Sequence, residues 1–558
     1  MQKIAVEWHH PYVTGLRVYR SSADSRVAPF ALTLLLCLAW LLPGLVGHAP
    51  WKGSEAQTMG LVHSILSGAP VWLPTLGGEP WAHAAPPLYP LVAALFAQLL
   101  SPWLPVHDGA RLAAGMFILL VMLFSAWTGR ELYGHRHGRL VVLTLVGSIG
   151  LWVAAHESIP QSAELCGVAL FGYGMALMLR RTWLGSILAG TGIGICFMAS
   201  GVLETLALLL TLLVLPVAGS AWRTRRFWLA LSLIVLAASP WLIWWPWQVW
   251  HAAPDWFAHW WRLQRQQLVF WAAAPVYPSG YYFGFLPWFA WPAWPLALWT
   301  LWQSRRNWGV PGVIFPLVMW LCNTLVLSCD VKPDPVSGLP LLLPLAWLAA
   351  GGSASLRRGA ANALYWFAMM TFGVLALAVW VYWSALDLGY PVDLARHLHA
   401  LQPLYQGHFH LQSALLAILY CVAWLAMLTR MKRAIHRPLL VWAAGMTLAW
   451  GLAAFLFVRP IDARLSYAPM MSDLNHYLPQ NSCVASRGLG AGVRGMLDYY
   501  LGLQTLRETS VGERTCRFML VEYGDDEADI PAVNGWSAVW HGQRMGNHVE
   551  RYVLYRRD

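Results

Sequence analysis

The chain has 558 residues, of which 58% are hydrophobic and only 11% are charged, and its mean hydropathy is +0.49. This composition excludes a soluble globular protein and a disordered chain, and it is typical of a protein that crosses a membrane many times. The formal net charge of +11 would suit a protein that binds nucleic acid. However, about 20 of the 37 basic residues fall in seven short clusters between apolar runs, where membrane topology explains them.

These clusters orient the chain, because Lys and Arg resist translocation and therefore mark the cytoplasmic ends of membrane helices. The clusters are Lys3/Arg17/Arg20/Arg26, Arg130/Arg136/Arg139, Arg180/Arg181, Arg223/Arg225/Arg226, Arg305/Arg306, Arg357/Arg358 and Arg430/Lys432/Arg433/Arg437. The apolar runs between them predict thirteen membrane helices. They lie near residues 28–46, 110–128, 140–155, 164–179, 183–201, 203–219, 227–246, 281–302, 308–328, 339–350, 360–384, 412–429 and 439–458.

This count places residues 1–27 in the cytoplasm, as an uncleaved N-terminus, and residues 459–558 outside. A fourteenth apolar run, residues 88–104, lies between prolines and has no basic cluster at either end. If it crossed the membrane, every later cluster would move to the outside. We therefore expect it to lie in the membrane surface or to re-enter from outside, within a first outer loop of residues 47–109. We expect Ser54 to cap a helix in that loop, with Glu55 in its first turn.

The external tail is expected to be a small α+β domain. Helical spacing is found at residues 465–478 and 492–503, and strand-like patterns at 482–486, 517–523 and 551–555. Cys483 and Cys516 share this oxidising compartment and could form a disulfide. Five other cysteines lie in apolar runs, and no Cys/His spacing of a zinc or haem site is present.

Polar residues on the outer side are the candidates for chemistry, because ionisable groups near membrane depth are costly and usually functional. Each also has a simpler explanation. Glu55 could merely complement the helix dipole, the second outer loop could hold polar residues at two helix ends, and the arginines could contact lipid head groups. Most of the 36 tryptophans fit an interfacial aromatic belt, although a few could line a site for a lipid tail or a sugar. The candidates are Lys52, Glu55, His83, His156, Glu157, Gln161, Glu164, Arg262, Arg265 and Lys332.

Several segments together resemble the GT-C glycosyltransferases that use polyprenyl-phosphate sugars, most closely the aminoarabinose transferases that modify lipid A. The segments are the acidic first-loop helix followed by SGAPVWLPTLGG, the loop ending in PPLYP, the basic Trp-rich loop, YYFGFLPW, and a Lys-x-x-Pro segment leading into LPLLLPLA. The resemblance covers nearly the whole chain. It implies a GT-C-like membrane domain of about thirteen helices, residues 28–458, with periplasmic juxtamembrane helices and the external domain.

The chain departs from the family at its acidic motifs. An Asp-Glu pair is replaced by Ser54-Glu55, and an Asp of the second loop corresponds to Gln161, with Glu157 and Glu164 nearby. The Glu-Lys-Pro of the first loop is replaced at His83 and Ala84. A hydroxyl acceptor needs a carboxylate base, whereas a lipid A phosphate is largely ionised at pH 7. The departures therefore favour a phosphate acceptor, with Arg262, Arg265 and Lys332 stabilising the departing polyprenyl phosphate.

The resemblance implies an inner-membrane enzyme whose active site faces the periplasm and moves an amino sugar or pentose from undecaprenyl phosphate to lipid A. A divalent cation is a possible cofactor. Two alternatives stay open at this point: a catalytically weakened or accessory member of the fold, and a transporter of lipid or sugar. Transporters usually carry internal repeats with broken helices in matching halves. No such repeat is evident in the sequence.

Overall fold

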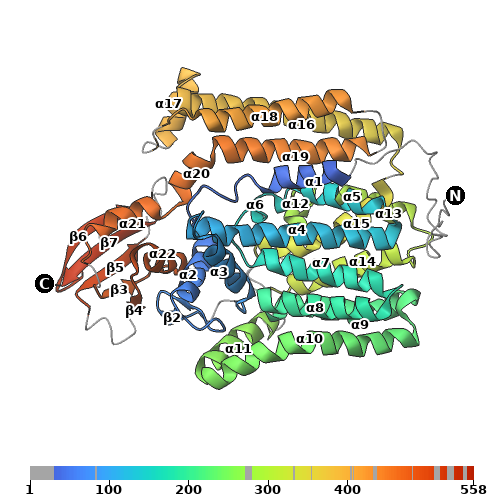
Figure 1. Cartoon of the computed structure of the whole chain (residues 1–558), viewed down its shortest axis with the longest axis horizontal. Helices are drawn as coiled ribbons and strands as arrows, with labels where there is room; N and C mark the ends of the chain where they lie inside the picture. Colours follow the sequence, from blue (N-terminus) through green and yellow to red (C-terminus); the bar gives the residue numbers. More distant parts are fainter. Residues whose placement is uncertain are drawn as a thin grey trace.

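The computed structural model describes residues 30–557 except 82–84, 270–279, 331–332, 354, 402–404, 406, 432–435, 480–481, 508–515, 524–532 and 545–549. Long helices run side by side along the molecule, and a small sheet domain formed by the C-terminal tail stands at one end of them (Figure 1). This architecture confirms the expected helical membrane domain with an α+β tail.

Seven helical segments of the described residues are long and apolar enough to cross a membrane. They are α4 (Val106–Tyr133), α8 (Thr182–Ser200), α10 (Arg225–Ala252), η3 with α15 (Val336–Ser353), α16 with η4 (Arg358–Leu388), α18 (Leu411–Arg430) and α19 (Arg437–Leu456). Shorter apolar helices are α1 (Phe30–Leu41), α3 (Leu88–Leu100), α5 (His137–Val146), α9 (Val202–Ala218) and α14 (Pro311–Leu327). With α7 (Gln161–Met178), each of the thirteen predicted spans contains helix. The number of crossings itself stays a prediction.

Two of the predicted spans are broken rather than continuous. The span near 281–302 consists of α12 (Tyr281–Phe289) and α13 (Ala293–Gln303), with Pro292 between them. Proline has no N–H to donate and interrupts a helical hydrogen-bond ladder. The span near 140–155 consists of α5 and the single turn α6 (Leu151–Ala154). The break brings the Gly150 N–H to the Phe289 carbonyl at 2.8 Å, so the two interruptions meet.

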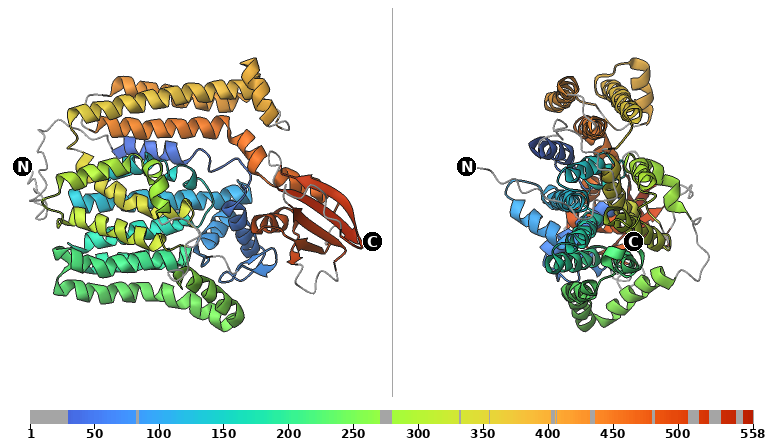
Figure 2. Two further views of the ribbon diagram at one scale, coloured as in Figure 1. Left: turned by 180° about the vertical axis from the view of Figure 1, so that it is seen from behind. Right: turned by 90° about the vertical axis from the view of Figure 1, so that its right-hand side faces the viewer.

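Helices α7 and α8 pack closely because glycines let their backbones approach. A Cβ on Gly174 would lie 2.4 Å from the Ala189 nitrogen, and one on Gly192 would lie 2.5 Å from the Phe171 nitrogen. Contacts between small residues are the usual means of packing membrane helices. Almost all of α7 is buried, whereas α16 and α18 are mostly exposed and form one edge of the bundle (Figures 1 and 2).

Shorter elements gather at the end of the bundle that carries the tail domain. These are α2 (Ser54–Leu66), the hairpin β1 (Thr75–Leu76) and β2 (Glu79–Pro80), α3, α11 (Pro254–Val269) and α17 (Val392–Leu401) (Figure 1). Helix α3 has 13 residues, a length of about 20 Å, which is less than a membrane-spanning helix needs. However, α1 has only 12 residues and is predicted to cross, so the expectation that residues 88–104 do not cross stays a prediction.

The tail domain is a five-stranded sheet in the order β4-β3-β5-β7-β6. Its elements are α20 (Val458–Leu465), α21 (Ala468–Asn475), β3 (Val484–Arg487), α22 (Ala491–Leu501), β4 (Thr505–Arg507), β5 (Phe518–Tyr523), β6 (Trp536–Gln543) and β7 (Arg551–Arg557). β3 pairs in parallel with β4 and β5, and β7 pairs antiparallel with β5 and β6. Strands β4 and β6 were not predicted.

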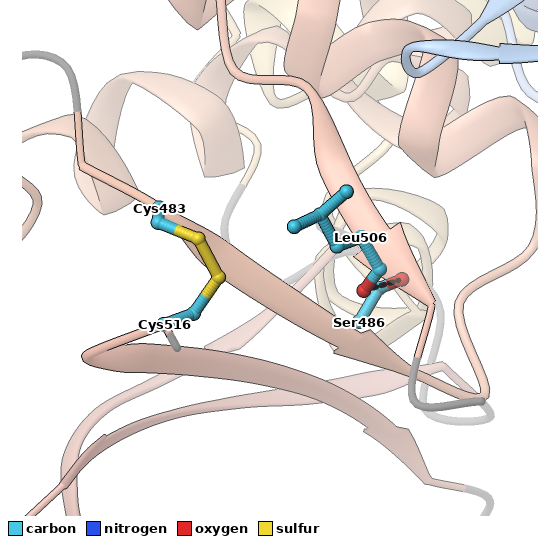
Figure 3. Close-up of a disulfide and its surroundings, with 4 residues drawn as sticks. All are labelled: Cys483, Ser486, Leu506 and Cys516. Atoms are coloured by element: carbon cyan, nitrogen blue, oxygen red, sulfur yellow. Dashed lines mark hydrogen bonds between the residues drawn. A yellow bond between two sulfur atoms is a disulfide. The ribbon is translucent and has the colours of Figure 1, made fainter. Parts of the chain in front are cut away.

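A disulfide joins Cys483 to Cys516 beside the first residues of β3 and β5, with the two Cα atoms 4.9 Å apart (Figure 3). The pairing expected from the sequence is therefore present. On the other side of β3, the Ser486 hydroxyl donates to the Leu506 carbonyl of β4 (Figure 3). The helix expected at 465–478 is wrong in its first residues, because the Ser466 hydroxyl accepts the Ala468 N–H and α21 begins there.

The tail domain docks on the first outer loop through two glycines. A Cβ on Gly60 of α2 would lie 2.6 Å from the Gly495 Cα of α22, so the two helices touch backbone to backbone. The buried Arg494 beside this contact donates to the Gly77 carbonyl and pairs with Glu79 at 3.3 Å. The first loop and the tail domain are consequently packed together.

Candidate active site

A cavity of about 660 Å³ opens where the α6–α7 loop, α12 and the start of η3 meet. Its walls are almost entirely apolar and aromatic. The residues that line it are Ile149, Gly150, Val153, Ala154, Glu157, Tyr281, Gly284, Phe285, Trp288, Phe289, Pro335 and Val336. Glu157 is the carboxylate among them. A mostly apolar pocket with one placed polar group is the usual form of a ligand site.

The broken helices create this cavity. Gly150 lies against the Phe289 ring, where a Cβ would come within 2.5 Å of the ring carbons, so α6 can approach α12 only with glycine at this position. The chain then turns through residues 155–160 before α7 begins. Glu157 lies on that turn, half-buried between the cavity and the protein interior.

Burial raises the pKa of the Glu157 carboxyl to about 7, and the nearby negative charges of Glu55 and Asp334 act in the same direction. The positive charge of Arg111 opposes them. At neutral pH, Glu157 therefore exists both as the carboxylic acid and as the carboxylate. A carboxyl group with a pKa near the working pH suits either proton donation or proton acceptance.

Glu55 lies behind this loop in a buried ion pair, with 2% of its surface exposed. Its Oε1 accepts from the Arg111 Nε at 2.8 Å and from the Ser158 N–H at 3.2 Å, and its Oε2 accepts the Trp51 N–H at 2.9 Å. Burial alone raises the pKa of Glu55, but the charge of Arg111, with help from His48 and the Trp51 N–H, brings the net pKa below its ordinary value. Glu55 is therefore a carboxylate.

Ser54 is not the cap of α2, contrary to our expectation. The residue before the helix is Gly53, at a φ of 91° that glycine tolerates and other residues rarely adopt, and no side chain caps the helix there. Glu55 reaches back to the Trp51 N–H instead. The first-loop helix forms as predicted, but Glu55 contributes to its start more than Ser54 does.

The sequence did not single out Arg111, which is fully buried. Besides Glu55, it donates to Asp108 at 2.9 Å and to the carbonyl groups of His48 and Ala49. The spacing of Asp108 and Arg111 by three residues in the first turns of α4 was a signal that could have identified this pair. Their long-range partner, 56 residues away, has no such local signature.

The other candidates of the second loop point into the protein. Both ring nitrogens of the buried His156 face carbonyl groups, those of Trp152 at 2.7 Å and Trp40 at 3.0 Å. Burial lowers the pKa of His156 to about 4. Glu164 is buried in α7 and accepts from the Ser200 hydroxyl at 2.7 Å. One oxygen of Glu164 and the side-chain oxygen of Gln161 have no hydrogen-bond partner among the described residues.

The basic candidates lie away from the described cavity wall. Arg262 and Arg265 are exposed on α11, and Lys52 pairs with Glu550 of the tail domain at 3.9 Å. His83 and Lys332 fall outside the described residues. Within the part of the chain that the structure describes, no group of three or more His, Cys, Asp or Glu is arranged to hold a metal ion. The divalent cation stays an expectation from the sequence.

Two solved structures resemble the chain over almost its whole length. One is ArnT from Cupriavidus metallidurans bound to undecaprenyl phosphate, with a TM-score of 0.69, 16% sequence identity, and coverage of 94% of this chain and 97% of that chain. The other is the same ArnT in the apo state, with a TM-score of 0.67, 15% identity and the same coverage. No protein-family model and no curated protein sequence matches the chain. The GT-C fold resembling ArnT is thereby established.

Proposed function

We propose that this GT-C chain is an inner-membrane glycosyltransferase that moves an amino sugar or pentose from undecaprenyl phosphate to a phosphate of lipid A on the periplasmic side. The observation that carries the proposal is the apolar cavity with Glu157 on its wall. Its volume of about 660 Å³ suits part of a polyprenyl chain, whose binding requires apolar surface. The structural likeness to ArnT bound to undecaprenyl phosphate supports the same class of donor.

In the proposed reaction, an acceptor phosphate oxygen forms a bond to the anomeric carbon of the sugar. The bond between that carbon and the donor phosphate oxygen breaks, and polyprenyl phosphate leaves with the electron pair. An ionised acceptor needs no base, so the protein contributes mainly positioning and charge stabilisation. Glu157 in its acid form can donate a hydrogen bond to a phosphate oxygen. If the acceptor were a hydroxyl, its carboxylate form could take the proton instead.

The arginines of α11 are proposed to act at the lipid interface rather than on the cavity wall. Arg262 and Arg265 are exposed on α11, and this helix lies at the end of the bundle that carries the tail domain (Figure 1). Arg binds phosphate with two parallel hydrogen bonds, so the pair could hold the anionic head group of the donor as it enters. Lys332 is proposed to neutralise the leaving phosphate, as the sequence resemblance implies.

The test is the composition of lipid A in cells that carry the protein, lack it, or carry Glu157→Gln. Mass spectrometry should find the sugar-modified lipid A only with the active protein. Glu157→Gln should reduce the modified fraction modestly if the acceptor is an ionised phosphate, and about 100-fold if Glu157 must take a proton from a hydroxyl acceptor. Asp393→Asn on α17, whose side chain is 95% exposed, is the matched control and should leave the fraction unchanged. Unmodified lipid A in the wild type would instead favour the accessory-protein alternative.

A further inference from the structure

Both carboxylate oxygens of Glu55 accept hydrogen bonds from protein groups. Its two oxygens accept from Arg111, Ser158 and Trp51, and the cavity wall does not include it. An acid or base that acts on a substrate must reach within hydrogen-bond distance of it. Glu55, with 2% exposure and three bonds already made, lacks that reach in this structure.

The Ser158 N–H that Glu55 holds belongs to the residue next to Glu157. Three other polar contacts involve the same turn. The Ser158 hydroxyl pairs with the Tyr89 hydroxyl of α3 at 3.0 Å, and the two His156 ring nitrogens face carbonyl groups of α1 and α6. Groups from α2, α3, α1 and α6 therefore converge on residues 156–158. Glu157, which lies within this restrained segment, lines the cavity.

Arg111 supports Glu55 from the opposite side. Its guanidinium contacts Glu55, Asp108 and the carbonyl groups of Leu45, His48 and Ala49, so it joins α4 to the chain that leads into α2. A planar guanidinium that bonds two carboxylates and several carbonyl groups at once fixes the position of Glu55 more strictly than a lysine could. The orientation of Glu55 toward Ser158 is consequently determined by the fold and not by a substrate.

We infer that Glu55 is a positioning residue: paired with Arg111, it holds the Ser158 N–H and thereby fixes Glu157 on the wall of the cavity. This inference rests on the proposed function, in which Glu157 is the group that meets the substrate. It differs from a catalytic role for Glu55, because Glu55 acts on the reaction only through the second loop.

Charge gives this arrangement a second consequence. The ionised groups that act on Glu157 are Glu55 of α2, Arg111 of α4 and Asp334 before η3, and Glu55 is the largest of the charged contributors that raise the pKa of Glu157. Removing the negative charge of Glu55 removes a contribution that raises the pKa of Glu157, while the positive charge of Arg111 continues to lower it. The pKa of Glu157 should then fall, and the pH midpoint of any activity that depends on Glu157 should move to lower pH.

The experiment measures amide hydrogen exchange of residues 155–160 in the full chain in detergent, together with the pH profile of transfer. Glu55→Gln should speed exchange at Ser158 by about tenfold or more, because a hydrogen bond to a charged acceptor is lost, and should shift the pH midpoint downward. Glu55→Asp keeps the charge but shortens the reach. It should speed exchange at Ser158 while leaving the pH midpoint close to that of the wild type.

Asp108→Asn is the matched control, because Asp108 is the other carboxylate on Arg111. Its hydrogen bonds among the described residues go to Arg111 and the Gly47 N–H, not to the second loop. It should leave exchange at Ser158 unchanged. Unaltered exchange at Ser158 in both Glu55 variants, or equal acceleration in Asp108→Asn, would overturn the inference. If the wild type shows no transfer while the exchange results hold, the proposed function fails and the positioning role stands.

Discussion

At the scale of single residues, the site separates two acids that the sequence placed together. Glu157 faces the cavity, whereas both oxygens of Glu55 accept hydrogen bonds from protein groups. Sequence could identify both as candidates, because ionisable groups near membrane depth are costly and usually functional. It could not rank them, because the choice depends on Arg111, whose contact with Glu55 spans 56 residues. Nor could it distinguish Glu157 from Gln161, which lie close together in the sequence.

Glu157 should make the stability of the protein depend on pH. Its pKa is raised to about 7 by burial, against about 4.3 in an unfolded chain. The folded state therefore binds the proton more tightly, and this stabilising contribution is complete below about pH 4.3 and lost as the pH rises to 7. Because Gln does not ionise, the free energy of unfolding of Glu157→Gln should rise relative to that of the wild type as the pH increases from 5 to 8, by on the order of 1–3 kcal/mol.

Thermal unfolding of both proteins in detergent at pH 5 and pH 8 measures this difference. The gap between the unfolding midpoints of Glu157→Gln and wild type should widen at pH 8. A gap that is the same at both pH values would mean that the pKa of Glu157 is not raised in the folded protein.

At the scale of elements, the apolar segments were predictable but their interruptions were not. Runs of apolar residues bounded by arginines predicted the position of every long helix, because a helix that crosses a membrane needs apolar side chains along its length. The break between α12 and α13 and the short α6 depend on Pro292 and on Gly150, whose N–H donates to the Phe289 carbonyl. A hydropathy pattern does not record this contact. The cavity lies at these interruptions. Strands β4 and β6 escaped prediction because β4 has three residues and β6 is irregular where it pairs with β7.

The contact between α2 and α22 predicts that the tail domain supports the first outer loop. Gly60→Leu would place side-chain atoms where the Gly495 backbone lies, since even a Cβ would come within 2.6 Å of it. Overpacking of this kind typically costs about 1–3 kcal/mol. The variant should therefore be cleaved faster by protease between the membrane domain and the tail domain, and its transfer activity should fall.

Gly373→Ala on α16 is the control for this substitution, because a Cβ there has nothing within 4 Å. It should resist protease as the wild type does. If Gly60→Leu resists protease as well as the wild type does, the contact between α2 and α22 does not hold the two domains together. The tail domain would then have no supporting role.

At the scale of the whole molecule, the basic clusters predict an N-terminus in the cytoplasm and a tail domain in the periplasm. The gathering of α2, α3, α11 and α17 at the same end as the tail domain agrees with one outer face that carries the site (Figure 1). Reporter fusions after Arg181 and Arg306 should report the cytoplasm, and a fusion at Asp558 should report the periplasm. A periplasmic signal at Arg181 would reverse the assignment of inside and outside.

Transfer by the purified chain in lipid vesicles tests the central claim most directly. The donor is undecaprenyl phosphate carrying a radiolabelled amino sugar or pentose, and the acceptor is lipid A. The account predicts that the label moves to lipid A, that undecaprenyl phosphate is released in equal amount, and that Glu157→Gln slows this transfer only modestly, because an ionised acceptor needs no base. Label that remains on the donor with every such sugar, under conditions where the protein is folded and the vesicles are intact, would contradict it.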